Sequence, residues 1–161
     1  MSQVASFALD TPQYVQRMLN SYRRWVGVEL MERTGDPQRD LQQLFALPVV
    51  VVSHGDQTDP IFKFGNQTAL QLWEIELHDF LKMPSRLTAE PVHRDERARL
   101  LERTERDGYV DDYRGVRISS TGRRFYIEQA TIWNVVDEED RYVGQAATFD
   151  HWTFLADGET A

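Results

Sequence analysis

Cysteine is absent from this chain of 161 residues. The absence excludes a disulfide framework, a thiolate nucleophile and a cysteine-ligated metal site. Lysine is almost absent too, since Lys63 and Lys82 are the two that the chain has, and the net charge is −8. Because affinity for nucleic acid comes mainly from clustered Lys and Arg that neutralise phosphates, we expect no nucleic-acid partner.

The chain also lacks a long hydrophobic run. No segment approaches the ~20 apolar residues that span a bilayer, so we expect no membrane partner. The start, MSQVASFALD, has no basic region followed by an apolar stretch, and we expect no signal peptide. These observations predict a soluble, cytoplasmic protein. A length of 161 residues with 41% hydrophobic residues is enough for one domain with a core of its own.

Extended segments dominate the last third of the chain, residues 108–152. Three runs are joined by two polar turns, at 120–122 and 137–140. In the central run both alternating sets of positions carry β-branched or aromatic side chains, which predicts a strand covered on both faces. Polar groups on a covered sheet face indicate a pocket, a partner, or both.

The earlier segments predict helices around a hairpin. A helix over 10–31 begins near Asp10 and Pro12, and a short helix follows over 40–46. Strands 48–54 and 61–64 form the hairpin, a helix starts at 65–66, and 79–90 is irregular. A charged helix over 92–107 turns only Ala98 and Leu101 inward and otherwise faces solvent.

This order predicts an α+β fold, with a five-stranded antiparallel sheet and helices on one face. The N-terminal amphipathic helix then covers the opposite face or pairs with a second copy. We expect a single domain over 1–161, divided into a helical segment at 10–46 and a core at 48–152.

The element order is that of a PAS domain, and particular motifs carry a closer resemblance. They are GYVDDY at 108–113, GVRIS at 115–119, GRRF at 122–125, Trp133-Asn134 and GQAA at 144–147. Over roughly 11–152 the chain resembles the MEKHLA domain, a PAS-related family. That family occurs as stand-alone bacterial proteins, the type expected here, and at the C-terminus of plant homeodomain leucine-zipper transcription factors. The resemblance implies a sensory or regulatory role and no known set of catalytic residues.

The apolar stripe of the first helix has two interpretations, which can coexist. It packs against the protein's own sheet, or it forms the interface of a homodimer, because Tyr, Trp and Met are enriched in interface cores. The dimer candidates are Val15, Met18, Leu19, Tyr22, Trp25 and Val26.

A pocket would draw on polar strand residues and on apolar residues from the helical middle. Glu128 is the most informative carboxylate, because on a covered face it must be paired, with Arg117, Arg123 or Arg124, or else face a ligand. The pocket candidates are Trp73, His78, Phe80, Met83, Tyr126, Glu128, Gln129, Thr131, Trp133, Gln145 and Thr148.

Metal and cofactor signals are weak. The histidines, at 54, 78, 93 and 151, show no HxH or HExxH spacing, and we expect no metal site. His93 and His78 are weak candidates for haem ligation. Asp111 and Asp112 would point to opposite faces of a strand and would not chelate together. Flavin photochemistry that needs a cysteine adduct is excluded, while haem and non-covalent flavin stay open.

Three functions follow from these patterns. The first is a PAS-like sensory or regulatory module that binds a small ligand or a protein partner, as a homodimer, and is not an enzyme. The second is a small cone-shaped α+β enzyme of the isomerase or dehydratase type, which needs an acid–base pair in its pocket. A pocket with His54 or His78 beside a carboxylate would favour it. The third is a purely structural dimer.

Overall fold

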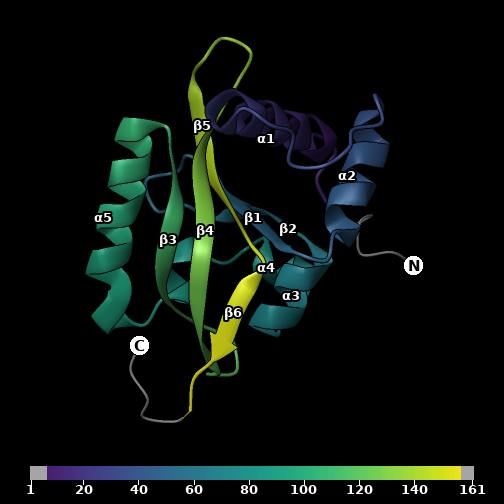
Figure 1. Ribbon diagram of the computed structural model, residues 1–161. Helices are drawn as coiled ribbons and strands as arrows, with labels where there is room; N and C mark the ends of the chain where they lie inside the picture. The colour runs from purple at the N-terminus through teal and green to yellow at the C-terminus, as the bar shows by residue number, and fades with distance from the viewer. Residues whose placement is uncertain (1–6, 157–161) are drawn as a thin grey trace.

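The computed structural model describes residues 7–156 and contains a six-stranded antiparallel sheet (Figure 1). Its strand order is β2-β1-β5-β4-β3, and β6 pairs with β4 beyond the end of β5. The α+β prediction is confirmed, with one strand more than the five expected. The strands are β1 Val50–His54, β2 Phe62–Gly65, β3 Tyr109–Ile118, β4 Arg124–Val136, β5 Tyr142–Phe149 and β6 His151–Phe154.

Six helical segments accompany the sheet: α1 Thr11–Val26, α2 Pro37–Ala46, α3 Gln67–Trp73, α4 Leu77–Phe80, the 3-10 helix η2 Ser85–Thr88 and α5 Pro91–Asp107. The first helix ends earlier than predicted, because Gly27 adopts a left-handed conformation with φ of 90° and caps it. The stretch expected to be irregular, 79–90, contains the end of α4 and all of η2. No helix within 7–156 has the length and apolar character needed to cross a membrane.

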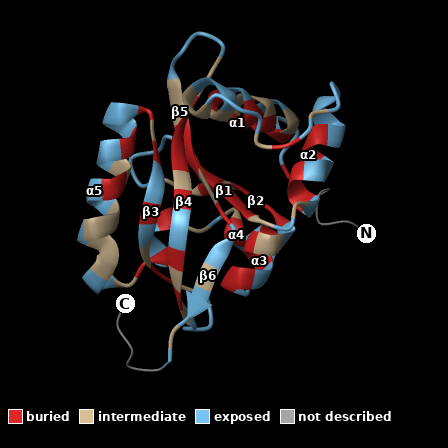
Figure 2. Ribbon diagram, in the orientation of Figure 1, coloured by how far each residue is buried: buried red, intermediate tan, exposed pale blue. Residues whose placement is uncertain are grey.

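The helices form two layers around the sheet. Figure 1 shows α5 on one side of strands β3, β4 and β5, and α1 with α2 on the other. We call the face beneath α3, α4, η2 and α5 the inner face, and the face beneath α1 and α2 the outer face. Figure 2 shows buried residues along β1, while β3 and β6 have many exposed positions.

The apolar stripe of α1 packs on the outer face of its own sheet. Val15, Met18 and Leu19 are completely buried. The indole nitrogen of Trp133, from β4, donates a hydrogen bond to the Met18 carbonyl at 3.0 Å. Three of the six dimer candidates therefore lie inside the chain's own core and present no surface to a second copy. Tyr22, Trp25 and Val26 are half-buried, and Trp25 donates to the Asn134 carbonyl.

Tyr14 joins α1 to the centre of the sheet. Its hydroxyl lies 2.7 Å from Ser53 Oγ and also donates to the His54 carbonyl at 3.2 Å. Gly144 makes this approach possible, because a Cβ there would lie 2.3 Å from the His54 oxygen and 2.5 Å from the Tyr14 hydroxyl. A buried polar group must be hydrogen-bonded, and this cluster meets that requirement.

Asn66 links three elements at the other end of β1. Its side-chain oxygen accepts from the amides of Val51 and Ala69, which caps α3. Its side-chain nitrogen donates to the Val49 carbonyl at 2.7 Å and to the Leu44 carbonyl at 3.3 Å. The side chain is fully buried, so α2, β1 and α3 meet at one satisfied polar residue.

Two irregularities in the β3–β4 ladder change which residues face inward. The register shifts between Val110 and Tyr113 and again between Tyr113 and Gly115. On β4 the extra residue lies beside Gln129, whose φ of 54° is left-handed. Asp111 and Asp112 are consequently both exposed, whereas regular alternation predicted opposite faces.

The inward surface of α5 differs from the prediction. Leu100 and Thr104 are buried, whereas Ala98 is exposed and Leu101 is half-buried. Arg97 lies one turn before Leu100 and Leu101 on the same side of the helix. The charged helix therefore carries a cation on the face that meets the sheet.

A matched pair of leucines tests the packing of α1. We expect Leu19→Ala to lower the free energy of unfolding by about 2–5 kcal/mol, because it leaves a cavity between α1 and the sheet. Leu9→Ala, at a fully exposed position, should change it by about 0.5 kcal/mol or less. Urea unfolding followed by circular dichroism measures both. Equal effects would contradict the packing of α1 described above.

Candidate functional site

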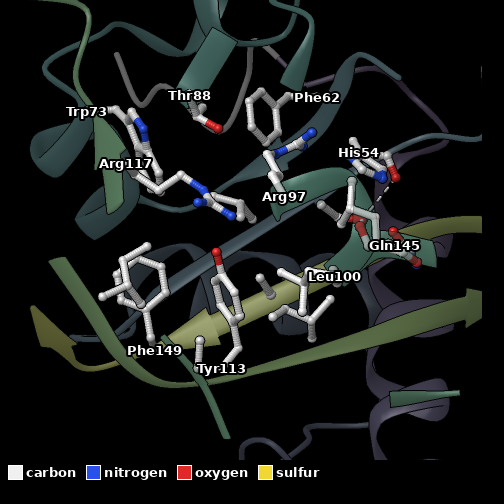
Figure 3. A pocket seen from close by; sticks show the side chains of 18 residues that line it. His54, Phe62, Trp73, Thr88, Arg97, Leu100, Tyr113, Arg117, Gln145 and Phe149 are labelled. Carbon is white, nitrogen blue, oxygen red and sulfur yellow. Dashed lines mark hydrogen bonds between the residues drawn. The ribbon is translucent and has the colours of Figure 1, made fainter. Parts of the chain in front are cut away.

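An internal cavity of about 70 Å³ lies between the inner face of the sheet and α5 (Figure 3). Strands β1, β3, β4 and β5 form its floor, and residues from α3, η2 and α5 close it from above. The lining residues are Val52, Ser53, His54, Phe62, Trp73, Thr88, Arg97, Leu100, Leu101, Tyr113, Arg117, Ile127, Ala130, Ile132, Gln145, Ala146, Ala147 and Phe149.

The shift in β4 brings the strand residues of the lining together. Before Gln129 the odd-numbered residue Ile127 faces inward, and after it the even-numbered Ala130 and Ile132 do. Ala147 lies opposite Ile132 on the neighbouring strand. All four side chains are aliphatic groups no larger than isoleucine, and two of them are alanines, so the sheet leaves room beneath α5.

Two arginines, Arg97 and Arg117, line the cavity (Figure 3). Arg97, from α5, donates from Nη2 to Ser85 Oγ at 2.8 Å. Burial, followed by the nearby charge of Arg117, lowers the pKa of Arg97 from 12.5 to about 10. Arg97 is therefore still protonated at neutral pH.

Arg117, from β3, is buried and donates from Nη1 to the carbonyl of Val116 at 2.8 Å. Its guanidinium carbon lies 5.3 Å from the centre of the Tyr113 ring. The Tyr113 hydroxyl donates to Glu96 at 3.1 Å. Within residues 7–156 neither Arg97 nor Arg117 forms an ion pair with a carboxylate, and the cavity lining contains no acid.

His54 lies in the cavity wall as a neutral imidazole. Its Nδ1 is 2.7 Å from Ser85 Oγ, and because that oxygen already accepts from Arg97, the serine hydroxyl donates to the ring. Burial first, and then the charge of Arg97, lower the pKa of His54 from 6.5 to about 4, against a hydrogen bond with Gln145 that raises it. Gln145 itself donates to the Leu101 carbonyl at 2.9 Å and to Asn134 at 3.2 Å.

Trp73 carries an unsatisfied donor at the other end of the cavity. The side chain is 4% exposed, and its indole nitrogen has no hydrogen-bond partner among the described residues. Its ring makes edge contacts with Phe125 and Phe149, with centroids 5.3 and 6.2 Å apart. Buried donors without a partner are rare in folded proteins, so this nitrogen marks a position where an acceptor is missing.

Two of the predicted pocket residues, Trp73 and Gln145, line the cavity. Phe80 is buried behind it and stacks on Phe62 at 4.0 Å, and Met83 is half-buried beside that pair. His78 is exposed, with Nε2 3.1 Å from Lys82 Nζ.

The remaining predicted pocket residues lie away from the cavity. Trp133 faces α1, and Thr148 is paired with Thr131 on the same outer face. Tyr126 and the exposed Glu128 also alternate away from the cavity, and Gln129 is exposed at the bulge. These candidates came from both parities of β4, and neither set faces inward throughout, because the strand changes parity at residue 129. Glu128 is exposed, so it is not the buried, paired carboxylate that a covered face would require.

Arg97 and Arg117 were missed as cavity residues, although the sequence carried a signal for one of them. Positions 97, 100, 101 and 104 fall on one side of α5, and three of them are uncharged. An arginine that joins an otherwise uncharged stripe is a candidate for the interior. Nothing comparable marks Arg117, since alternation along β3 does not tell which of its two faces meets α5.

The cavity does not fit the larger cofactors. Pockets for drug-sized ligands occupy roughly 300–1,000 Å³, so neither a flavin nor a haem fits into 70 Å³. His93 and His78, the two haem candidates, do not line it. Within residues 7–156 no group of three or more His, Asp or Glu side chains is arranged to hold a metal ion.

The lowered pKa of His54 predicts a pH dependence of stability. Between about pH 6.5 and pH 4 the unfolded chain binds a proton that the folded imidazole does not. The stabilising contribution is therefore complete above pH 6.5 and lost as the pH falls, to a limit of about 3 kcal/mol. We expect His54→Asn, which retains an acceptor for Ser85, to show a smaller difference in unfolding free energy between pH 7 and pH 4.5 than the wild type does.

Denaturant unfolding at several pH values measures this slope. His93→Asn, on α5 and outside the cavity lining, is the control and should retain the wild-type slope. An unchanged slope in His54→Asn would show that His54 is not the group responsible.

Solved structures with this arrangement include PAS and light-oxygen-voltage domains. The PAS domain of a protein from Colwellia psychrerythraea superposes with a TM-score of 0.61 and 14% identity, covering 71% of this chain and 95% of that one. The light-state dimer of the fungal blue-light photoreceptor Vivid gives a TM-score of 0.59 and 16% identity, covering 89% and 95%. At these identities the similarity establishes the fold, which is an α+β PAS fold.

Curated relatives are plant proteins. The homeobox-leucine zipper protein HOX9 of Oryza sativa subsp. indica is 24% identical over 147 residues, and ATHB-14 of Arabidopsis thaliana is 27% identical over 152 residues. The alignments cover 91% and 92% of this chain, which spans 18% of either relative. The MEKHLA domain family model matches residues 12–154. The chain belongs to the MEKHLA domain family.

Proposed function

We propose that this domain is a sensory module that detects a small molecule bound in its internal cavity. The observation that carries the proposal is the cavity itself, which lies between the sheet and α5 and is lined by residues from both. A ligand there touches β1, β3, β4, β5 and α5 together. Its binding energy can therefore shift the position of the helix relative to the sheet, which is how a bound ligand biases two conformations.

Family membership and fold support a regulatory role. The relatives named above are homeobox-leucine zipper proteins, and the structural neighbours include photoreceptors. In this chain the blue-light mechanism has no basis, because cysteine is absent and the cavity is too small for a flavin. The signal is therefore a smaller molecule.

The competing enzyme hypothesis required an acid–base pair in the pocket. His54 does line the cavity, but it is bonded to Ser85 and Gln145. The lining also includes no carboxylate, so no acid–base pair faces a ligand there. We propose that the domain acts by binding and not by catalysis.

The predicted homodimer is a separate proposal. Since Val15, Met18 and Leu19 pack on the chain's own sheet, a dimer would use other surfaces or would have to displace α1. Sedimentation velocity of the full chain tests it: a concentration-dependent species of twice 18.8 kDa supports the dimer, and a single 18.8 kDa species at all concentrations removes it.

Filling the cavity tests ligand detection. A screen of small metabolites by ligand-observed NMR should identify binders, and a binder at 100 times its Kd should raise Tm by roughly 5–10 °C. We expect Ala147→Leu, which extends a half-buried cavity side chain, to abolish both responses. Ala147→Val is a smaller step in the same direction.

Thr148→Val provides the matched control, since it lies next along β5 and faces the opposite side of the sheet. It should leave binding unchanged. If Ala147→Leu and Thr148→Val change the affinity for the binders equally, or if the screen finds no binder, the result counts against a ligand-binding cavity.

A further inference from the structure

We propose that the internal cavity binds a short-chain carboxylate, held by Arg97, Arg117 and the indole N–H of Trp73. This inference rests on the proposed function and names the chemical class of the ligand. It depends on the hydrogen-bonding character of the lining, on its charge, and on the volume left between the side chains.

The charge of the cavity is unbalanced. Arg97 and Arg117 both line the cavity (Figure 3), the charge of Arg117 contributes to the lowered pKa of Arg97, and no carboxylate belongs to the lining. Two acids near this end of α5 have other partners: Glu96 accepts from Tyr113, and Asp59 accepts from Arg86. A buried charge is costly unless it is paired. An anionic ligand would supply the missing partner for both guanidinium groups.

The lining is rich in donors that have no acceptor. Each guanidinium has five N–H groups; Arg97 donates to Ser85, and Arg117 donates to the Val116 carbonyl and bonds to Tyr113, which leaves further N–H groups on both. The Trp73 indole nitrogen has no partner within the described residues. A carboxylate only accepts hydrogen bonds and matches the planar fork of an arginine. A ligand with donors of its own would leave these groups unsatisfied.

The remainder of the lining selects a carboxylate over an inorganic anion. Val52, Phe62, Leu100, Ile132 and Phe149 offer hydrocarbon and no hydrogen bonds. Phosphate would place polar oxygens against this surface, whereas a short alkyl chain would pack on it. A cavity of about 150 Å³ accommodates benzene, so 70 Å³ is suited to a molecule with about two to four carbons.

A surface groove offers a way in. It is lined by residues of the β1–β2 loop, of α5 and of β5, and it shares four lining residues with the cavity: His54, Arg97, Leu101 and Gln145. The groove also carries the carboxylates of Asp56, Glu102 and Glu105, so Arg97 is the cation at which the acidic groove and the cavity meet.

Calorimetric titration of the full chain with sodium propionate tests the ligand class, with propionamide, sodium phosphate and sodium chloride as comparisons. Propionate should bind at one site. Propionamide has a similar shape but no charge, and it should bind at least about tenfold more weakly, because hydrogen bonds to a charged group are stronger than those to a neutral one. Two results would overturn the proposal. One is that propionamide binds as tightly as propionate, and the other is that phosphate or chloride displaces propionate at equal concentration.

Variants locate the bound carboxylate. Arg117→Met and Arg97→Met should each weaken propionate binding at least about tenfold, whereas Arg114→Met, exposed on the same strand as Arg117, should not. Without ligand, Arg117→Met should melt no lower than wild type, because it removes a buried cation that has no carboxylate partner. Loss of binding in Arg114→Met to the same degree would contradict the assignment.

The indole signal of Trp73 gives an independent readout. The chain has four tryptophans, and Trp73→Phe identifies the Trp73 signal in a ¹H–¹⁵N spectrum by its disappearance. Propionate should move that signal more than the other three, and Trp73→Phe should bind propionate more weakly while it keeps the aromatic packing. If the Trp73 signal does not move when propionate saturates the protein, the role of this donor is overturned. This measurement uses the wild-type chain, so it can be made even if an arginine variant does not fold.

Failure of this inference differs from failure of the proposed function. If no carboxylate binds while an uncharged metabolite binds wild type and loses affinity in Ala147→Leu, the carboxylate is wrong and the sensory cavity stands. If neither a carboxylate nor any other small molecule binds, both are wrong.

Discussion

The double register shift in the β3–β4 ladder is the constraint on which the interior depends. These are the strands with the longest shared ladder in the sheet, and a regular pairing would place alternate residues on one face throughout. The shift on β4 instead allows Ile127, Ala130 and Ile132 to face inward together, where Tyr113 and Arg117 line the same cavity from β3. Gln129 adopts a left-handed conformation at the shift, so the local backbone accepts a cost in order to place these side chains.

The two faces of the sheet are stabilised by different means. The outer face is closed by apolar packing beneath α1, with Tyr14 and Trp133 as its polar attachments. The inner face is closed by a network that runs from Arg97 through Ser85 to His54. Packing density leaves little room on the outer side. On the inner side, the cavity is lined by two arginines and by no acid, so its positive charge is complementary to an anion.

Much of the fold was predictable because it follows from local patterns. The hairpin at 48–64, the turns at 120–122 and 137–140 and the charged helix before Gly108 were expected and are present. The placement of the cavity residues was not. Alternation left open which face of the last strands lines a pocket, and it assigns faces only while a strand is regular. Trp133 and Thr148 lie on the outer face, whereas Ala130 and Ile132 line the cavity.

The sequence by itself determined the element order, the family and the absence of thiol chemistry, because turn residues, hydrophobic periodicity and composition act over short distances. Only the tertiary structure decided that Arg97 and Arg117, twenty positions apart on a helix and a strand, share one cavity with Trp73. Helix α5 crosses the sheet at a place fixed by packing, and the bulges fix which strand residues it meets. Long-range packing of that kind leaves no periodic signal in the chain.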